Sequence, residues 1–237
     1  MANLIIDIGN TALKSAWADG MTLGKTFRYQ GEKMTEFILS LTEKERPEIM
    51  VISSVRRLTK QNVSKLEHVC DHLMVVDETV LGKHSLPLSM TPDRAASIIA
   101  SRYLFKGRGC TIFDFGTMLT VDFLDVEGKF AGGCISPGCM TRFKSVNRYS
   151  KQLPLLSMPE EIEEKGMTIS SSIASGVISG IMFEIEGWIN QNPQNINVFT
   201  GGDANYFAKR MKNSIFVVRN LVLMGLALIA LEYDKTN

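Results

Sequence analysis

The residues most able to do chemistry form a short run near the start of the chain, residues 7–14, with the sequence DIGNTALK. Asp7 closes an apolar run and Gly9 follows it, so a strand would pass directly into a turn whose backbone N–H groups can approach an anion closely. The hydroxyl of Thr11 and the ammonium of Lys14 would add donors to phosphate. The run indicates a phosphate-binding loop; a strand-to-turn transition in which Asp7 caps a bend is the alternative.

A second run of this kind starts at Asp114, 107 residues after Asp7, and continues through Gly116 and Thr117. Taken alone it is another β-turn. Two D-x-G turns at equivalent places in a duplicated chain would instead face each other and hold a phosphate chain between them. We therefore interpret the pair as two phosphate loops.

Three further motifs are weaker alone. Gly201 and Gly202 follow an apolar run and precede a helix, where a backbone can pass close to a flat ligand or a phosphate, or simply turn tightly. Residues 132–138, GGCISPG, form a glycine-rich turn after a predicted hairpin. Asp93 either caps the helix that begins near residue 95 or takes a proton from a substrate hydroxyl, with Arg94 binding a carboxylate.

The elements that must position these residues alternate between buried strands and helices, which predicts an α/β fold. Each half opens with a strand, a D-x-G turn and a hairpin, so we expect a duplicated unit with halves 1–108 and 109–237. Helices are expected at 32–41, through residues 63, 66 and 69, from 95, at 169–191, from about 205 and at 221–231. Further strands are expected at 4–8, 13–17, 26–29, 49–55, 111–117, 121–124, 130–135 and 197–200.

Composition limits the functional classes. The 237 residues carry 26 Lys+Arg and 25 Asp+Glu, a formal charge of +1, which argues against bulk binding of nucleic acid or an anionic membrane. The longest apolar run, residues 221–231, is shorter than the roughly 20 residues that span a bilayer. Four cysteines without a signal peptide favour a reducing compartment, so we expect a cytoplasmic protein. Arg56, Arg57 and Lys60 predict a solvated helix start, or a basic cluster for an anionic substrate.

In combination and order, these motifs resemble the type III pantothenate kinase family over essentially the whole chain. The family pattern is D-x-G-N-T, G-x-D-R, D-x-G-T-x-x-T-x-D, G-G-x-I-x-P-G and T-G-G. It corresponds to residues 7–11, 91–94, 114–122, 132–138 and 200–202, with Thr91 in place of the glycine of G-x-D-R. The resemblance implies duplicated ribonuclease-H-like or actin-like halves, each a mixed sheet flanked by helices, with a nucleotide cleft between them. It also implies ATP-dependent phosphorylation of pantothenate, the first step of coenzyme A synthesis, by a homodimer.

The resemblance also implies roles. Asp93 would be the general base, and Asp114 would lie at a site for K⁺ or NH₄⁺, with Mg²⁺ accompanying ATP. The ATP-binding residues would be Asp7, Ile8, Gly9, Asn10, Thr11, Ala12, Leu13, Lys14, Thr117, Gly201 and Gly202. The pantothenate-binding residues would be Thr91, Pro92, Asp93, Arg94 and Thr168.

The departures from the family pattern gather on the acceptor side. Thr91 replaces a glycine, His84 a tyrosine, and Ile169 a threonine for which the adjacent Thr168 can substitute; Met118 and Lys151 replace small residues. They leave two alternatives open: a kinase for another small hydroxy acid, and a nucleotide-binding regulator without kinase activity. The retained Asp7, Asp93, Arg94 and Asp114 speak against the regulator.

Overall fold

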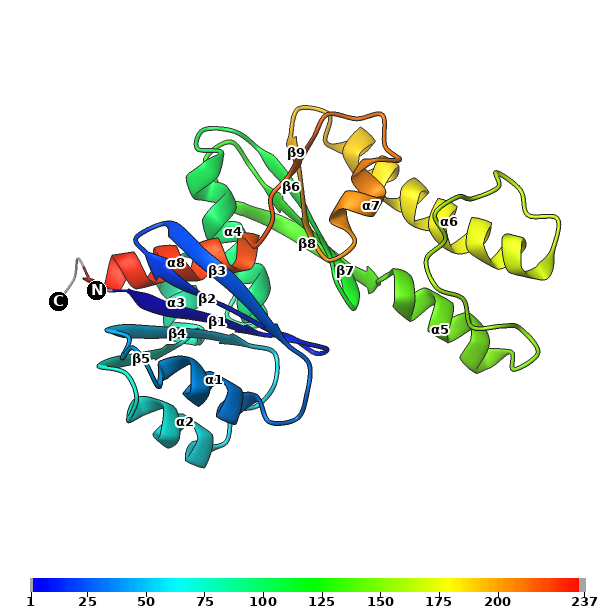
Figure 1. The fold of residues 1–237 in the computed structure, drawn as a ribbon. Helices are drawn as coiled ribbons and strands as arrows, with labels where there is room; N and C mark the ends of the chain where they lie inside the picture. Colours follow the sequence, from blue (N-terminus) through cyan, green and yellow to red (C-terminus); the bar gives the residue numbers. More distant parts are fainter. Residues whose placement is uncertain (1, 235–237) are drawn as a thin grey trace. The chain divides into compact units, whose positions relative to one another are not determined.

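The computed structural model describes residues 2–234, and these form two compact units (Figure 1). Unit 1 holds the residues up to Leu104 together with those from Asn220 onward, and unit 2 is Phe105–Arg219. Each unit contains one five-stranded sheet with helices packed against it.

Unit 1 has the sheet order β3-β2-β1-β4-β5. Its strands are β1 (Asn3–Ile8), β2 (Leu13–Asp19), β3 (Thr22–Tyr29), β4 (Ile49–Ser54) and β5 (His72–Val75). Its helices are α1 (Met34–Thr42), α2 (Lys60–Glu67), α3 (Glu78–Lys83), α4 (Pro92–Leu104) and α8 (Leu221–Asp234).

Unit 2 has the sheet order β10-β9-β6-β7-β8. Its strands are β6 (Cys110–Phe115), β7 (Met118–Leu124), β8 (Phe130–Pro137), β9 (Ile196–Gly201) and β10 (Ile215–Val217). Its helices are α5 (Cys139–Tyr149), α6 (Ile169–Gln191) and α7 (Ala204–Ala208).

The two sheets have the same topology, which confirms the predicted duplication. In each, the first three strands pair antiparallel, and the first strand also pairs in parallel with a later one, β1 with β4 and β6 with β9. Strands covered on both faces read as continuous apolar runs, which is why β1 and β6 were recognisable in the sequence. In both strands only the fifth residue, Asp7 or Asp114, departs from full burial.

The expected halves were residues 1–108 and 109–237, of which residues 1 and 235–237 lie outside the described part. The last helix departs from this division. Helix α8 belongs to unit 1, where it packs on α4 and on the sheet strands β1 and β4. Its residues Leu221, Leu223, Leu226, Ala227 and Ile229 are all buried. A helix that is apolar all round must be covered on several sides, and α4 together with the unit 1 sheet provides that cover.

Helix α6 is the core helix of unit 2. By length and composition it is the one helix in the described chain that could cross a membrane. Its buried residues include Ile178, Ile181, Ile185 and Ile189, which recur every three or four positions and pack in the unit 2 core. This periodicity is that of an amphipathic helix with one face on a core.

Gly225 allows α8 to approach α4 closely. A Cβ at this position would overlap the carbonyl oxygen of Ala96 and lie 2.5 Å from its carbonyl carbon. We expect Gly225→Ala to lower the free energy of unfolding by about 2 kcal/mol, since overpacking outweighs the gain in helix propensity. Urea unfolding measures this. Gly187→Ala in α6, where a Cβ would meet nothing within 4 Å, should instead stabilise by about 0.5–1 kcal/mol; equal effects of the two substitutions would contradict the interpretation.

Candidate functional site

The first predicted phosphate loop leaves the carboxyl end of β1. Asp7 lies in register with Lys14 on β2 and with Ser53 on β4, so a polar row crosses the sheet where β1 ends. Beyond it, the N–H of Gly9 donates to the carbonyl of Ala12 at 3.0 Å, which closes a tight turn. The turn therefore presents its tip, residues 10 and 11, to solvent.

A guanidinium supports this tip from the end of the neighbouring strand. Arg56 follows β4 and donates a hydrogen bond to the carbonyl oxygen of Asn10. The turn is held from behind as well, because the N–H of Val55 donates to the carbonyl of Ile8 at 3.1 Å. Of the predicted basic cluster, Arg56 thus contacts the loop, which places a positive charge beside an expected phosphate site.

The second loop occupies the equivalent place in unit 2, but its turn is one residue shorter. The N–H of Gly116 donates to the carbonyl of Met118 at 3.1 Å, two residues on, whereas the N–H of Gly9 reaches the carbonyl three residues on. The Thr117 carbonyl accepts two hydrogen bonds, from the N–H of Gly138 at 3.0 Å and from the hydroxyl of Thr141 at 2.6 Å. The GGCISPG motif therefore has a defined place, since its last glycine anchors the second loop.

Asp114 and Gly201 are brought together by strand pairing. The β6–β9 register sets Asp114 opposite Thr200 and Phe115 opposite Gly201. A Cβ on Gly201, whose φ is 91°, would overlap Oδ1 of Asp114 and lie 2.5 Å from the carbonyl oxygen of Phe115. A carboxylate oxygen and a carbonyl oxygen thus lie on the same side of Gly201, and oxygen donors of this kind suit a hard cation.

Asp203 follows the glycine pair and occupies the position before α7 without capping it by a side-chain hydrogen bond. Burial raises the pKa of its carboxyl group. The same desolvation raises the pKa of Cys139, at the start of α5, to about 12, with Asp203 as a second cause. Cys139 is therefore a buried, protonated thiol.

Residues 91–94 form the start of α4 in unit 1, and all four are half-buried. The carbonyl of Thr91 accepts from the N–H of Ala95 at 3.1 Å, and the Asp93 carboxylate accepts from the N–H of Arg94 at 2.9 Å. Proline at the first helical position presets the backbone there. The carboxylate and guanidinium thus stand on a rigid first turn rather than on a loop.

His84, one of the departures from the family pattern, makes structural contacts. Its Nε2 lies 3.2 Å from Oε2 of Glu232 on α8, and its carbonyl accepts from Arg102 on α4 at 2.8 Å. These contacts tie the end of α3 to two helices of unit 1. Burial lowers the pKa of His84, opposed by Glu232 and reinforced by Arg102 and Lys83.

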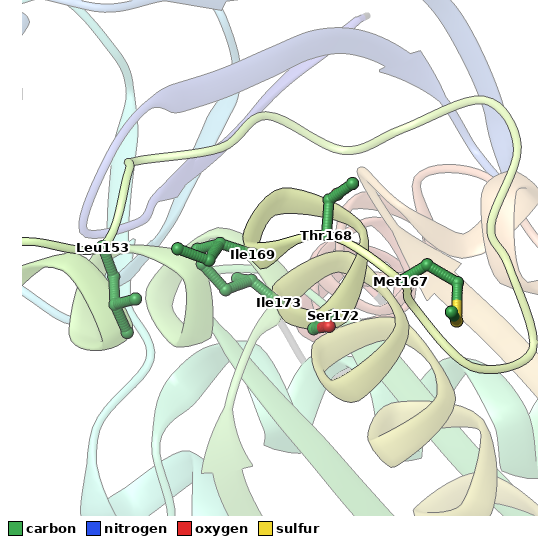
Figure 2. Close-up of a pocket in the computed structure, with 6 residues that line it drawn as sticks. All are labelled: Leu153, Met167, Thr168, Ile169, Ser172 and Ile173. Carbon is green, nitrogen blue, oxygen red and sulfur yellow. The ribbon is translucent and has the colours of Figure 1, made fainter.

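Unit 2 contains a pocket of about 530 Å³ at the first turn of α6. Figure 2 shows its lining side chains, with Leu153 reaching toward Ile169 and Ile173, and Met167 on the other side of the turn. Thr168 and Ser172 complete the lining. Thr168 also begins the helix, because its hydroxyl accepts from the N–H of Ser171 at 3.1 Å while the Ser171 hydroxyl accepts from the N–H of Thr168.

The structure distributes the sequence-predicted residues over both units. Unit 1 carries residues 7–14 and 91–94, and unit 2 carries Asp114, Thr117, Gly201, Gly202 and Thr168. Sequence reasoning did not single out Thr141, whose hydroxyl donates to the second loop, or Arg142 and Glu184, which contact Ser136 beside it. Thr141 and Arg142 lie three and four residues after the glycine-rich motif, a signal that could have found them; Glu184 is 46 residues from Gly138 and has none.

Two units of equal topology, each with an Asp-x-Gly turn after its first strand, have the duplicated α/β fold of the actin and sugar-kinase type. Solved structures share this fold. The chain is similar to the activator of the 2-hydroxyisocaproyl-CoA dehydratase from Clostridium difficile with bound ADPNP, at TM-score 0.62 and 15% identity over 100% of this chain and 96% of that chain. It is also similar to the ROK hexokinase from Thermus thermophilus, at TM-score 0.54 and 13% identity over 98% and 100%.

Sequence comparison gives the family. The model of type III pantothenate kinase matches residues 3–191. The type III pantothenate kinase of Cytophaga hutchinsonii is 38% identical, covering 94% of this chain and 96% of the relative, and that of Phocaeicola vulgatus is 34% identical, covering 98% and 99%. The chain belongs to the type III pantothenate kinase family.

Gly201 offers a test of the second loop. Gly201→Ala should lower both the melting temperature and ATP-dependent turnover, because a methyl group would displace the Asp114 carboxylate in addition to straining a positive φ. Gly107→Ala is the matched control, since Gly107 has φ 75° and open space around it. Its expected cost is the conformational penalty of about 1–2 kcal/mol alone. Equal loss of turnover in both variants would show that the contact with Asp114 is irrelevant.

His84 gives a pH prediction. Its pKa in the folded chain lies below the unfolded value, so the unfolded chain takes up the proton first as the pH falls. The free energy of unfolding should therefore decrease between about pH 7 and about pH 5, and more steeply in the wild type than in His84→Asn. Urea titrations of both proteins measure the difference; parallel curves would contradict the assigned burial effect.

Proposed function

We propose that this chain transfers the terminal phosphoryl group of ATP to the hydroxyl of pantothenate, forming 4′-phosphopantothenate in the first step of coenzyme A synthesis. The observation that carries the proposal is membership of the type III pantothenate kinase family, with both phosphate loops inside the matched residues 3–191. As a member of that family the chain is an enzyme, a kinase that uses ATP. Phosphoryl transfer depends on positioning and charge neutralisation, which rigid turns at strand ends provide.

In this proposal the two loops bind the phosphates of ATP. In unit 1 the tip after Gly9 and the ammonium of Lys14 offer hydrogen-bond donors, and in unit 2 Thr117 offers its hydroxyl. Gly201 and Gly202 bring the backbone close to adenosine. The two hydrogen bonds received by the carbonyl of Thr117 support its role, because a phosphate contact needs a loop of fixed geometry.

Asp93 is proposed to accept the proton of the pantothenate hydroxyl, and Arg94 to bind the pantothenate carboxylate. A guanidinium suits a carboxylate because it can donate two parallel hydrogen bonds. The fixed first turn of α4 supports this assignment, since a general base must be held within hydrogen-bond reach of the proton that it removes. Thr91 and Pro92 complete this proposed substrate-binding segment.

The pocket at α6 supports a role of Thr168 in binding the acceptor. Its lining combines the apolar side chains of Leu153, Ile169 and Ile173 with two hydroxyl groups. Pantothenate likewise combines a dimethyl-substituted carbon with amide and hydroxyl groups. Because Ile169 stands where the family pattern has threonine, a kinase for another small hydroxy acid is the second candidate.

Two cations are proposed. Asp114, with the carbonyl of Phe115 on the same side of Gly201, would hold K⁺ or NH₄⁺, which neutralises phosphate charge. Mg²⁺ would accompany the ATP phosphates, as it commonly does with few protein ligands of its own.

We further propose a cytoplasmic homodimer that binds neither nucleic acid nor membrane. Apolar side chains are exposed on unit 2, with Phe183 at 70% and Ile169 at 61% exposure on α6, and Ile135 on β8. In α6, Phe183 and Ile169 lie opposite the row that packs in the core. Exposed apolar groups of this kind favour a protein partner, here a second copy of the chain.

The decisive experiment measures ADP release with ATP, Mg²⁺ and pantothenate in K⁺ and in Na⁺ buffer. We expect turnover that depends on pantothenate and is faster in K⁺. Asp93→Asn should reduce kcat by roughly 10²–10⁴-fold, the usual contribution of a general base, with little change in ATP affinity.

Asp114→Asn should remove the advantage of K⁺ over Na⁺. If Asp93→Asn keeps near wild-type kcat, the assignment of the base is wrong. Bound ATP without turnover on pantothenate would instead favour another hydroxy acid, which a panel of such acids would identify.

A further inference from the structure

Arg142 and Glu184 form a half-buried ion pair in unit 2 behind the glycine-rich turn. Their side chains are 22% and 21% exposed, and Nη2 of Arg142 donates to Oε2 of Glu184. Arg142 lies on α5, one turn after Gly138, while Glu184 lies on the long helix α6. The pair therefore links two helices at the point where β8 ends.

The same two side chains hold the turn itself. Nε of Arg142 donates to the carbonyl of Pro137 at 2.8 Å, and Nη2 of Arg142 donates to the hydroxyl of Ser136 at 3.1 Å. That hydroxyl in turn donates to Oε1 of Glu184 at 2.6 Å. Both residues before Gly138 are thus fixed by charge-assisted hydrogen bonds, which are shorter and stronger than neutral ones.

Gly138 transmits this arrangement to the second loop. Its N–H donates to the carbonyl of Thr117. A Cβ on Gly138 would overlap the carbonyl of Gly116 and lie 2.9 Å from the carbonyl of Thr117, so the two segments are in direct backbone contact. A shift of residues 136–138 must therefore move residues 116 and 117 as well.

From these contacts we propose that Arg142 and Glu184 are positioning residues for the second phosphate loop. Their ion pair holds the Ser136–Pro137–Gly138 turn against Thr117 and so sets where the loop meets the phosphates of ATP. This inference rests on the proposed function, because it concerns ATP bound at that loop. Neither residue is proposed to touch a reacting atom.

The test compares steady-state kinetics of the full chain with those of Glu184→Gln. Glutamine keeps the size of the side chain and an oxygen for Ser136, but it loses the charge that orients Arg142. We expect kcat/KM for ATP to fall about tenfold, the equivalent of about 1.4 kcal/mol of transition-state stabilisation. The KM for pantothenate should change less than about twofold, since the loop binds phosphate and not the acceptor.

Arg142→Lys is the second variant, and it keeps the positive charge. A single ammonium cannot reproduce the fork that reaches Pro137, Ser136 and Glu184 together, so this variant should resemble Glu184→Gln rather than the wild type. Asp71→Asn is the matched control, because it removes the exposed Arg46–Asp71 ion pair, 2.7 Å long, at the start of β5 in unit 1. Its kinetics should equal those of the wild type.

The proposal is overturned if both variants keep kcat/KM for ATP within about twofold of the wild type, or if the constants for ATP and pantothenate worsen equally. Failure of the proposed function is distinguishable from this result. If the unmodified chain does not turn over pantothenate, calorimetric titration with ATP decides instead, and we then expect weaker ATP binding by Glu184→Gln than by the wild type and Asp71→Asn. Equal affinities in all three would refute the positioning role.

Discussion

Parallel hydrogen bonding of β1 to β4 and of β6 to β9 holds the first strand of each unit at the centre of its sheet. A central strand is covered on both faces, so its last polar residue can face a ligand only where the strand ends. Asp7 and Asp114 occupy that position, and the glycine two residues later lets each chain turn without a side chain in the way. The candidate site depends on this constraint in both units.

The two loops are supported by different means. The first is braced by Arg56, which follows the neighbouring strand and reaches the carbonyl of Asn10. The second is braced by backbone and hydroxyl donors from residues 138 and 141. Duplication thus preserved the sheet and the turn, while the contacts behind the turn diverged.

Two residues that differ from the family pattern, His84 and Ile169, have roles that only the structure distinguishes. The imidazole of His84 pairs with the carboxylate of Glu232, and the backbone carbonyl of His84 accepts a hydrogen bond from Arg102. The His84 side chain therefore helps to hold α8 in unit 1. Ile169 joins Leu153 and Ile173 in an apolar lining, while the adjacent Thr168 contributes a hydroxyl beside it. The two substitutions therefore have different consequences: the one at His84 affects packing within unit 1, and the one at Ile169 changes the lining of a pocket.

The sequence by itself determined the α/β class, the duplication and the positions of the two Asp-x-Gly turns, because buried strands and such turns are local patterns. It predicted α6 as residues 169–191, the bounds that the structure has. Only the tertiary structure decided that α8 packs in unit 1, since an apolar helix fits any sufficiently large core and its partner is not encoded nearby. The link from Glu184 to Thr117 is likewise invisible in the sequence, because it joins side chains from separate elements through space.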